Sequence, residues 1–135
     1  MIAIDPTPNL TAQEARAVDG LRAAMELSHA TASNAGWYRD PATKQPIERN
    51  FGEVVALMHS ELSESLEAHR KGLASDKFPD RTGIEEEFVD CIIRILDTAA
   101  ALNLDIPGMF VRKNRYNVTR ADHSLAARAA GGKKY

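Results

Sequence analysis

The sequence has one cysteine, Cys91, and no apolar run as long as the roughly 18 residues of a membrane-spanning helix. A single cysteine excludes a disulfide within the chain and a metal site built from cysteines. Cys91 lies inside the apolar segment EEEFVDCIIRILDTAAAL, residues 85–102, which predicts a buried core thiol. The first residues, MIAIDPTPNL, lack the basic start and long apolar stretch of a secretion signal. These absences predict a soluble, cytoplasmic protein without a membrane partner.

An excess of positive charge is also absent. The chain has 17 Lys and Arg residues against 19 Asp and Glu residues, with a net charge of −2. Nucleic acids and anionic membranes attract proteins with a basic surface, so we expect neither as a partner. Any site for an anionic ligand must therefore be local. A length of 135 residues is enough for one domain with its own core, and we expect a single domain over residues 1–135.

No segment shows the alternating pattern of a β-strand, whereas helix start signals recur and predict an all-α fold. Three pairs of residues have the spacing of a capping box: Thr11 with Glu14, Asn50 with Glu53, and Thr82 with Glu85. Asp105 and Pro107 form a fourth start signal, because proline is tolerated in the first helical turn. The predicted helices run from about residue 12 to the early thirties, from 51 to 71 before Gly72, from 83 to 102, and from 105 to about 120.

Two long loops and a tail connect and follow these helices. Residues 34–49 contain two prolines and the only tryptophan, Trp37, and residues 72–83 read GLASDKFPDRTG. Long loops in a compact domain are often functional. From about residue 121 the chain is rich in alanine, which predicts a short helix followed by a flexible, basic end.

Paired carboxylates mark the second and third predicted helices. Glu61 and Glu64 lie three residues apart beside an apolar stripe, and Glu87 and Asp90 repeat that spacing in an otherwise apolar helix. If the two helices pack antiparallel, the four carboxylates face one another. Like charges crowded in this way repel, whereas a divalent cation neutralises them and prefers oxygen ligands. The pattern therefore predicts a metal site, although the simpler interpretation of each pair is a solvated helix face.

The fourth predicted helix carries the opposite charge. Lys113, Asn117 and Arg120 follow one another at i, i+4 and i+7 and share a helix face. A solvated basic helix is the alternative interpretation. Beside a metal site, however, an ammonium, an amide and a guanidinium suit the oxygens of a polyphosphate. Lys133 and Lys134 in the tail are candidates for the same anion, and a solvated terminus is the simpler interpretation for them.

Three segments resemble the motifs of the MazG-like, all-α nucleoside triphosphate pyrophosphohydrolases, which include dimeric dUTPases and dCTP pyrophosphatases. They are LMHSELSESLEA, EEFVDCIIRILDTAAALNLDI, and KNRYNVTR followed by GGKKY, and they span about residue 51 to the end. The family pattern E-x-x-E followed by E-x-x-D falls on Glu61, Glu64, Glu87 and Asp90. The tail departs from the family, because residues 124–130 separate Arg120 from Gly131 by more than close relatives have, which leaves the roles of Lys133 and Lys134 open.

The resemblance implies a four-helix bundle that assembles as a homodimer or homotetramer and hydrolyses a nucleoside triphosphate to the monophosphate and pyrophosphate. The four carboxylates would bind Mg²⁺, for which Mn²⁺ can substitute, and Glu61 or Glu64, with some preference for Glu64, would orient the attacking water. Arg94 and Asp97 would support the metal ligands from behind, as an ion pair or through hydrogen bonds. Lys113, Asn117 and Arg120 would hold the phosphates.

Recognition of the base falls to less distinctive parts of the chain. Trp37 offers a stacking face and His29 can donate or accept a hydrogen bond, and Tyr116 could stack as well. The alternatives are a loop anchor for Trp37, an ordinary surface histidine for His29, and core packing for Tyr116.

Two rival functions use the same features. A carboxylate-bridged di-iron bundle needs two Glu-x-x-His pairs, and the chain offers Glu26 with His29 alone. A non-catalytic helical interaction module would use the charged stripes as contacts with a partner.

Overall fold

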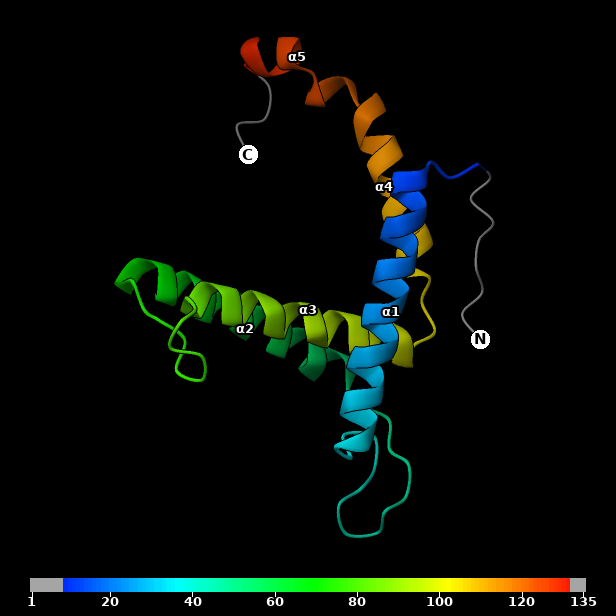
Figure 1. Ribbon diagram of the computed structural model, residues 1–135, viewed down its shortest axis with the longest axis vertical. Helices are drawn as coiled ribbons and strands as arrows, with labels where there is room; N and C mark the ends of the chain where they lie inside the picture. Colours follow the sequence, from blue (N-terminus) through cyan, green and yellow to red (C-terminus); the bar gives the residue numbers. More distant parts are fainter. Residues whose placement is uncertain (1–8, 132–135) are drawn as a thin grey trace. The chain divides into compact units, whose positions relative to one another are not determined.

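The computed structural model describes residues 9–131, except for the side chain of His123. Its helices are α1 (Ala12–Asn34), α2 (Phe51–Lys71), α3 (Gly83–Ala101), α4 (Ile106–Thr119), the 3₁₀ turn η1 (Ala121–His123) and α5 (Leu125–Ala129), all drawn in Figure 1. Within residues 9–131 two isolated bridges occur and no strand does. The all-α prediction is thus confirmed for this part of the chain, where no helix has the length and apolar content to cross a membrane.

Local capping explains why the helices begin and end close to the predicted positions. The backbone N–H of Glu85 donates to Thr82 Oγ1 over 3.2 Å, and that of Thr82 donates to Glu85 Oε2 over 2.8 Å. The same reciprocal bonds join Thr11 and Glu14, which confirms a second capping box. At the end of α2, Gly72 has a φ of 64°, a left-handed conformation that glycine adopts without strain.

The described chain divides into two compact units. Residues 9–22 and 105–131 form one, and Ala23–Leu104 form the other, so α1 begins in the first unit and ends in the second. The first unit contains α4, which Arg115 joins to the start of α1 by donating to both carboxylate oxygens of Glu14 over 2.7 and 2.8 Å. The single domain over residues 1–135 and the four-helix bundle stay predictions.

In the second unit α2 and α3 pack antiparallel along their length (Figure 1). Near one end, a Cβ added to Gly83 would lie 2.9 Å from the Cβ of Ala68, so this close approach requires a glycine. Near the middle, the thiol of Cys91 is 3.7 Å from the carbonyl oxygen of Met58. Cys91 is buried, as the sequence predicted.

The face of α2 that is buried is not its apolar stripe. The buried residues are Val54, Glu61, Ser65 and Ala68. The predicted stripe is largely exposed, since Phe51, Leu62 and Leu66 are 62, 48 and 59% exposed. The third helix also exposes large apolar side chains, namely Phe88, Val89, Ile92, Ile93 and Ile95.

Candidate metal site

Three carboxylates from α2 and α3 converge where the two helices pack. Glu61, Glu87 and Asp90 each offer an oxygen, and these oxygens all lie within 4.8 Å of one another. Glu61 is buried, and the other two are half-buried. Oxygens that bind one divalent ion lie about 2.0–2.6 Å from it, so two of them can be up to roughly twice that distance apart. The donor set and its spacing therefore suit a hard divalent cation.

Repulsion within this carboxylate cluster changes the ionisation of Glu87. Burial raises the pKa of Glu87 from 4.5 to about 7, and hydrogen bonding to Glu61 and the charges of Glu64, Glu61 and Glu86 act in the same direction. Without a cation, the cluster therefore holds a proton near neutral pH. A cation at the same place would displace that proton.

The fourth predicted ligand, Glu64, is exposed and lies outside the carboxylate cluster. Its charge acts on Glu87, and both side chains line a cavity of about 300 Å³. The structure thus brings together three of the four predicted metal ligands and leaves Glu64 at the edge of the site.

Arg94 and Asp97 do not pair with each other, so the ion pair predicted between them is wrong. The Nε of Arg94 instead donates to Oε1 of Glu61 over 2.7 Å and compensates the charge of that buried carboxylate. Arg94 therefore supports a residue of the carboxylate cluster from across the helix pair.

Asp97 is 4% exposed and joins three segments of the second unit. Its Oδ1 accepts a hydrogen bond of 2.8 Å from the Tyr38 hydroxyl and lies 2.9 Å from Nδ1 of His29, and its Oδ2 is 3.5 Å from Arg49 Nη1. Burial, and then the bond to Asp97, raise the pKa of Tyr38 to about 12. Asp97, on α3, thereby contacts α1 through His29, and it contacts the two ends of the loop after α1 through Tyr38 and Arg49.

Trp37 lies beside the carboxylate cluster. It is 63% exposed and carries the Arg49 guanidinium over its ring at 5.7 Å. It lines a cavity of about 410 Å³ whose other walls include Asp90, Arg94 and Asp97, so this cavity shares Asp90 with the cluster. His29 lines a different cavity, of about 490 Å³. Of the predicted base contacts, Trp37 is therefore the one placed at the cluster's cavity, whereas Tyr116 belongs to the first unit.

The predicted phosphate contacts of α4 also belong to the first unit. Lys113 Nζ lies 4.9 Å from the centre of the Tyr116 ring, which is more than half exposed, so core packing of Tyr116 is wrong for this chain alone. Oδ1 of Asn117 is buried without a hydrogen-bond partner. Arg120 follows the last residue of α4 and pairs with Asp122 over 2.5 Å. Lys133 and Lys134 lie outside the described residues.

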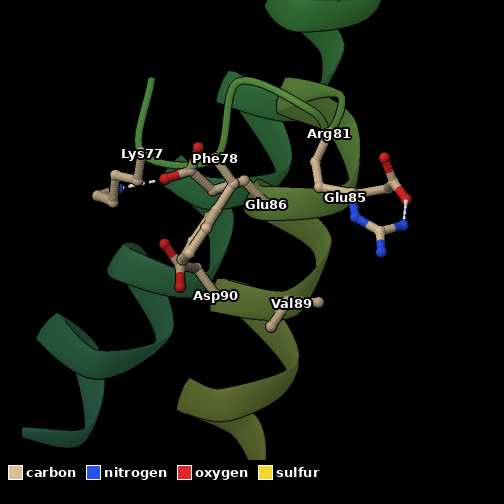
Figure 2. Close-up of a pocket in the computed structure, with 7 residues that line it drawn as sticks. All are labelled: Lys77, Phe78, Arg81, Glu85, Glu86, Val89 and Asp90. Atoms are coloured by element: carbon tan, nitrogen blue, oxygen red, sulfur yellow. Dashed lines mark hydrogen bonds and ion pairs between the residues drawn. The ribbon is translucent and has the colours of Figure 1, made fainter. Parts of the chain in front are cut away.

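The sequence analysis missed a polar cluster in the loop between α2 and α3. Ser75 is 4% exposed, and its hydroxyl donates to Oε2 of Glu86 while it accepts from the backbone N–H of Phe78 over 2.9 Å. The ammonium of Lys77 donates to Oε1 of the same Glu86 (Figure 2). The contact with Glu86, and then the charges of Asp90 and Glu87, raise the pKa of Lys77. The length of this loop indicated function, but its sequence alone did not indicate which side chain reaches the carboxylates.

The ionisation of Glu87 leads to a first prediction, made for the metal-free protein in a chelating buffer. Because the pKa of Glu87 in the folded state, about 7, exceeds the ordinary 4.5, its contribution to stability is complete below about pH 4.5 and is lost as the pH rises to about 7. We expect Glu87→Gln to unfold near the wild-type temperature at pH 5 and above it at pH 8. Thermal unfolding followed by circular dichroism measures this difference. A gap between the two proteins that is the same at both pH values would contradict the assignment.

No family model, curated protein or solved structure matches the chain.

Proposed function

We propose that the protein is a Mg²⁺-dependent nucleoside triphosphate pyrophosphohydrolase of the MazG-like kind. The observation that carries the proposal is the carboxylate cluster of Glu61, Glu87 and Asp90 at the packed face of α2 and α3. Burying acidic groups side by side lowers stability unless a cation or proton offsets their charge. Arg94 offsets the charge of Glu61, and the crowding that remains, which raises the pKa of Glu87 to about 7, supports a metal site.

In this proposal Glu61, Glu87 and Asp90 hold Mg²⁺, or Mn²⁺ in its place. When bound there, the ion would offset phosphate charge and favour ionisation of the attacking water. Arg94 keeps Glu61 oriented through its 2.7 Å bond. Glu64, exposed at the edge of the cluster, orients the attacking water and accepts its proton, because Glu61 is already occupied by Arg94 and the cluster. Water then adds to the α-phosphorus, and pyrophosphate leaves.

The nucleoside part of the substrate has a place in the same unit. The cavity of about 410 Å³ at Trp37 adjoins Asp90 and falls within the size range of small-molecule sites. Trp37 supplies a face on which a base can stack. His29 would contribute indirectly, since its bond to Asp97 holds the segment that carries Trp37. Lys113, Asn117 and Arg120 belong to the first unit, and their role as contacts for the β and γ phosphates stays a prediction from the sequence.

The exposed apolar faces of α2 and α3 support a homo-oligomer. A helix that is apolar around most of its circumference is normally covered on all sides, yet five large apolar side chains of α3 are between 41 and 51% exposed. Packing against the same helices of a second copy would bury them and complete a four-helix bundle. The fold and assembly implied by the family resemblance are thus proposed together.

The two rival functions stand differently. The carboxylate cluster contains no histidine, and His29 is engaged with Asp97, so neither feature favours a di-iron centre. The exposed apolar side chains favour the non-catalytic interaction module as a second candidate, because they would also serve a foreign partner.

A nucleotide panel distinguishes the enzyme from the interaction module. Standard and several modified nucleoside triphosphates are incubated with the protein and Mg²⁺, and pyrophosphate and monophosphate are measured. We expect equal amounts of the two products from at least one nucleotide, and none when a chelator removes the metal. Release of inorganic phosphate in place of pyrophosphate, or no reaction with any nucleotide, would contradict the proposed function.

A further inference from the structure

In the loop between α2 and α3, two side chains bind the same carboxylate of α3, that of Glu86. Both oxygens of Glu86 are used, since Oε2 accepts from Ser75 and Oε1 accepts from Lys77. The Glu86 side chain is 8% exposed, whereas that of Lys77 is 68% exposed. Glu86 therefore belongs to the fixed part of the loop contact. Lys77 can leave Glu86 without depriving it of its bond to Ser75.

Lys77 lies between two cavities that border the carboxylate cluster. One, of about 340 Å³, has Phe78, Val89 and Asp90 among its walls and is drawn in Figure 2. The other, of about 300 Å³, is lined by Glu64 and Glu87. Lys77 lines both, so its ammonium can reach the space in front of the carboxylates from the side of the loop.

A second cation, that of Arg94, also contacts the carboxylate cluster, but it is less free to change its partner. Arg94 is bonded to Glu61, a residue of the carboxylate cluster, and its side chain is 35% exposed, whereas that of Lys77 is 68% exposed and Glu86 keeps its bond to Ser75 when Lys77 leaves. A lysine on a flexible stem suits the opposite role, because it can exchange one oxygen partner for another at little cost in geometry. A triphosphate presents such oxygens, with more negative charge than Glu86.

We propose that Lys77 is a phosphate-binding residue, whose ammonium moves from Glu86 to the phosphate oxygens of a substrate held at the carboxylate cluster. This inference rests on the proposed function and adds a contact from the α2–α3 loop to those expected from α4. The loop then acts as one wall of the substrate site, and Ser75 keeps that wall in place when Lys77 changes partner.

The experiment compares three variants at saturating Mg²⁺. We expect Lys77→Gln to raise the KM for the nucleotide about tenfold, the loss of one charged hydrogen bond. Lys77→Arg should restore part of the affinity. The matched control is Lys71→Gln, which removes an exposed cation at the end of α2 that pairs with Glu67 and lines neither cavity, and it should change KM less than twofold. The Mg²⁺ concentration that half-saturates the protein without nucleotide should stay at the wild-type value in Lys77→Gln.

A binding measurement separates this inference from the proposed reaction. Calorimetry with inorganic tripolyphosphate and Mg²⁺ tests the phosphate contact without base or turnover. A tenfold weaker affinity in Lys77→Gln would support the contact even if the wild type hydrolysed no nucleotide. An affinity and KM within twofold of wild type, an equal effect of Lys71→Gln, or no tripolyphosphate binding by the wild type would overturn it.

Discussion

Asp90→Asn is expected to lower Mg²⁺-dependent pyrophosphate release by about a hundredfold or more, while helical circular dichroism stays unchanged. Asparagine has nearly the same shape, so the packing of α3 is preserved, but it removes one of the three charges that the cation would balance. The apparent affinity for Mg²⁺ should fall together with the activity. Titration of activity against Mg²⁺ concentration measures both effects.

Glu64→Gln should also remove most of the activity, but in a different way. Because Glu64 lies outside the carboxylate cluster, we expect its loss to lower kcat while the Mg²⁺ midpoint moves little. Asp80→Asn, a change at an exposed carboxylate of the α2–α3 loop, is the control and should retain full activity. Wild-type activity in either Asp90→Asn or Glu64→Gln would show that the site has been assigned to the wrong residues.

The second large effect is expected from a charge in the exposed face of α3. If the chain forms the proposed homo-oligomer, Ile92→Glu should convert it into monomers at micromolar concentration, because a carboxylate buried without a partner costs several kcal/mol at an interface. Ile92 is 51% exposed in the chain by itself, so the fold of one copy should tolerate the substitution. Size-exclusion chromatography with light scattering measures the mass.

Ile92→Leu is the matched control, since it retains the apolar contact and should retain the wild-type mass. Two results would contradict the proposal that a second copy of the chain packs against this face of α3. One is a wild-type protein that is itself a monomer at all concentrations tested. The other is an Ile92→Glu protein with an unchanged mass.

The features that the sequence predicted well are those set by neighbouring residues. The ends of the helices follow from Thr82, Asn50 and Gly72, whose effects act within one helical turn. The convergence of Glu61, Glu87 and Asp90 follows from the three-residue spacing of Glu87 and Asp90 together with the antiparallel packing expected of helices that follow one another in the chain.

The features that the sequence did not predict depend on distant partners. A local rule pairs Arg94 with Asp97 three residues later, but Arg94 is drawn to the buried Glu61, and Asp97 to Tyr38 and His29. These partners are far away in the sequence, and no spacing pattern identifies them. The same holds for Lys77, whose place beside the carboxylates depends on how Ser75 folds its loop.

The partner of the apolar stripe of α2 could not be predicted from the sequence for a different reason. Leu62 and Leu66 indicate a surface that needs covering, but a pattern does not tell whether the cover comes from the same chain. Within this chain the packed face of α2 is formed by small and polar residues, Glu61 among them. α2 therefore has a small, polar face that packs against α3 and an apolar face on its other side. Within the second unit only the first of these faces is covered.

The contacts of Asp97 with Tyr38 and Arg49 determine which part of the loop after α1 can vary in sequence. Tyr38 and Arg49 stand at the two ends of a loop whose interior has its own turn, built on bonds from Ala42 and Thr43 to Asp40. Because both ends of this loop are fixed by the carboxylate of Asp97, the residues between Tyr38 and Arg49 can be replaced without rearranging the helices. Residues 39–48 can therefore vary in length and sequence while the packing of α1 and α3 around Asp97 is kept.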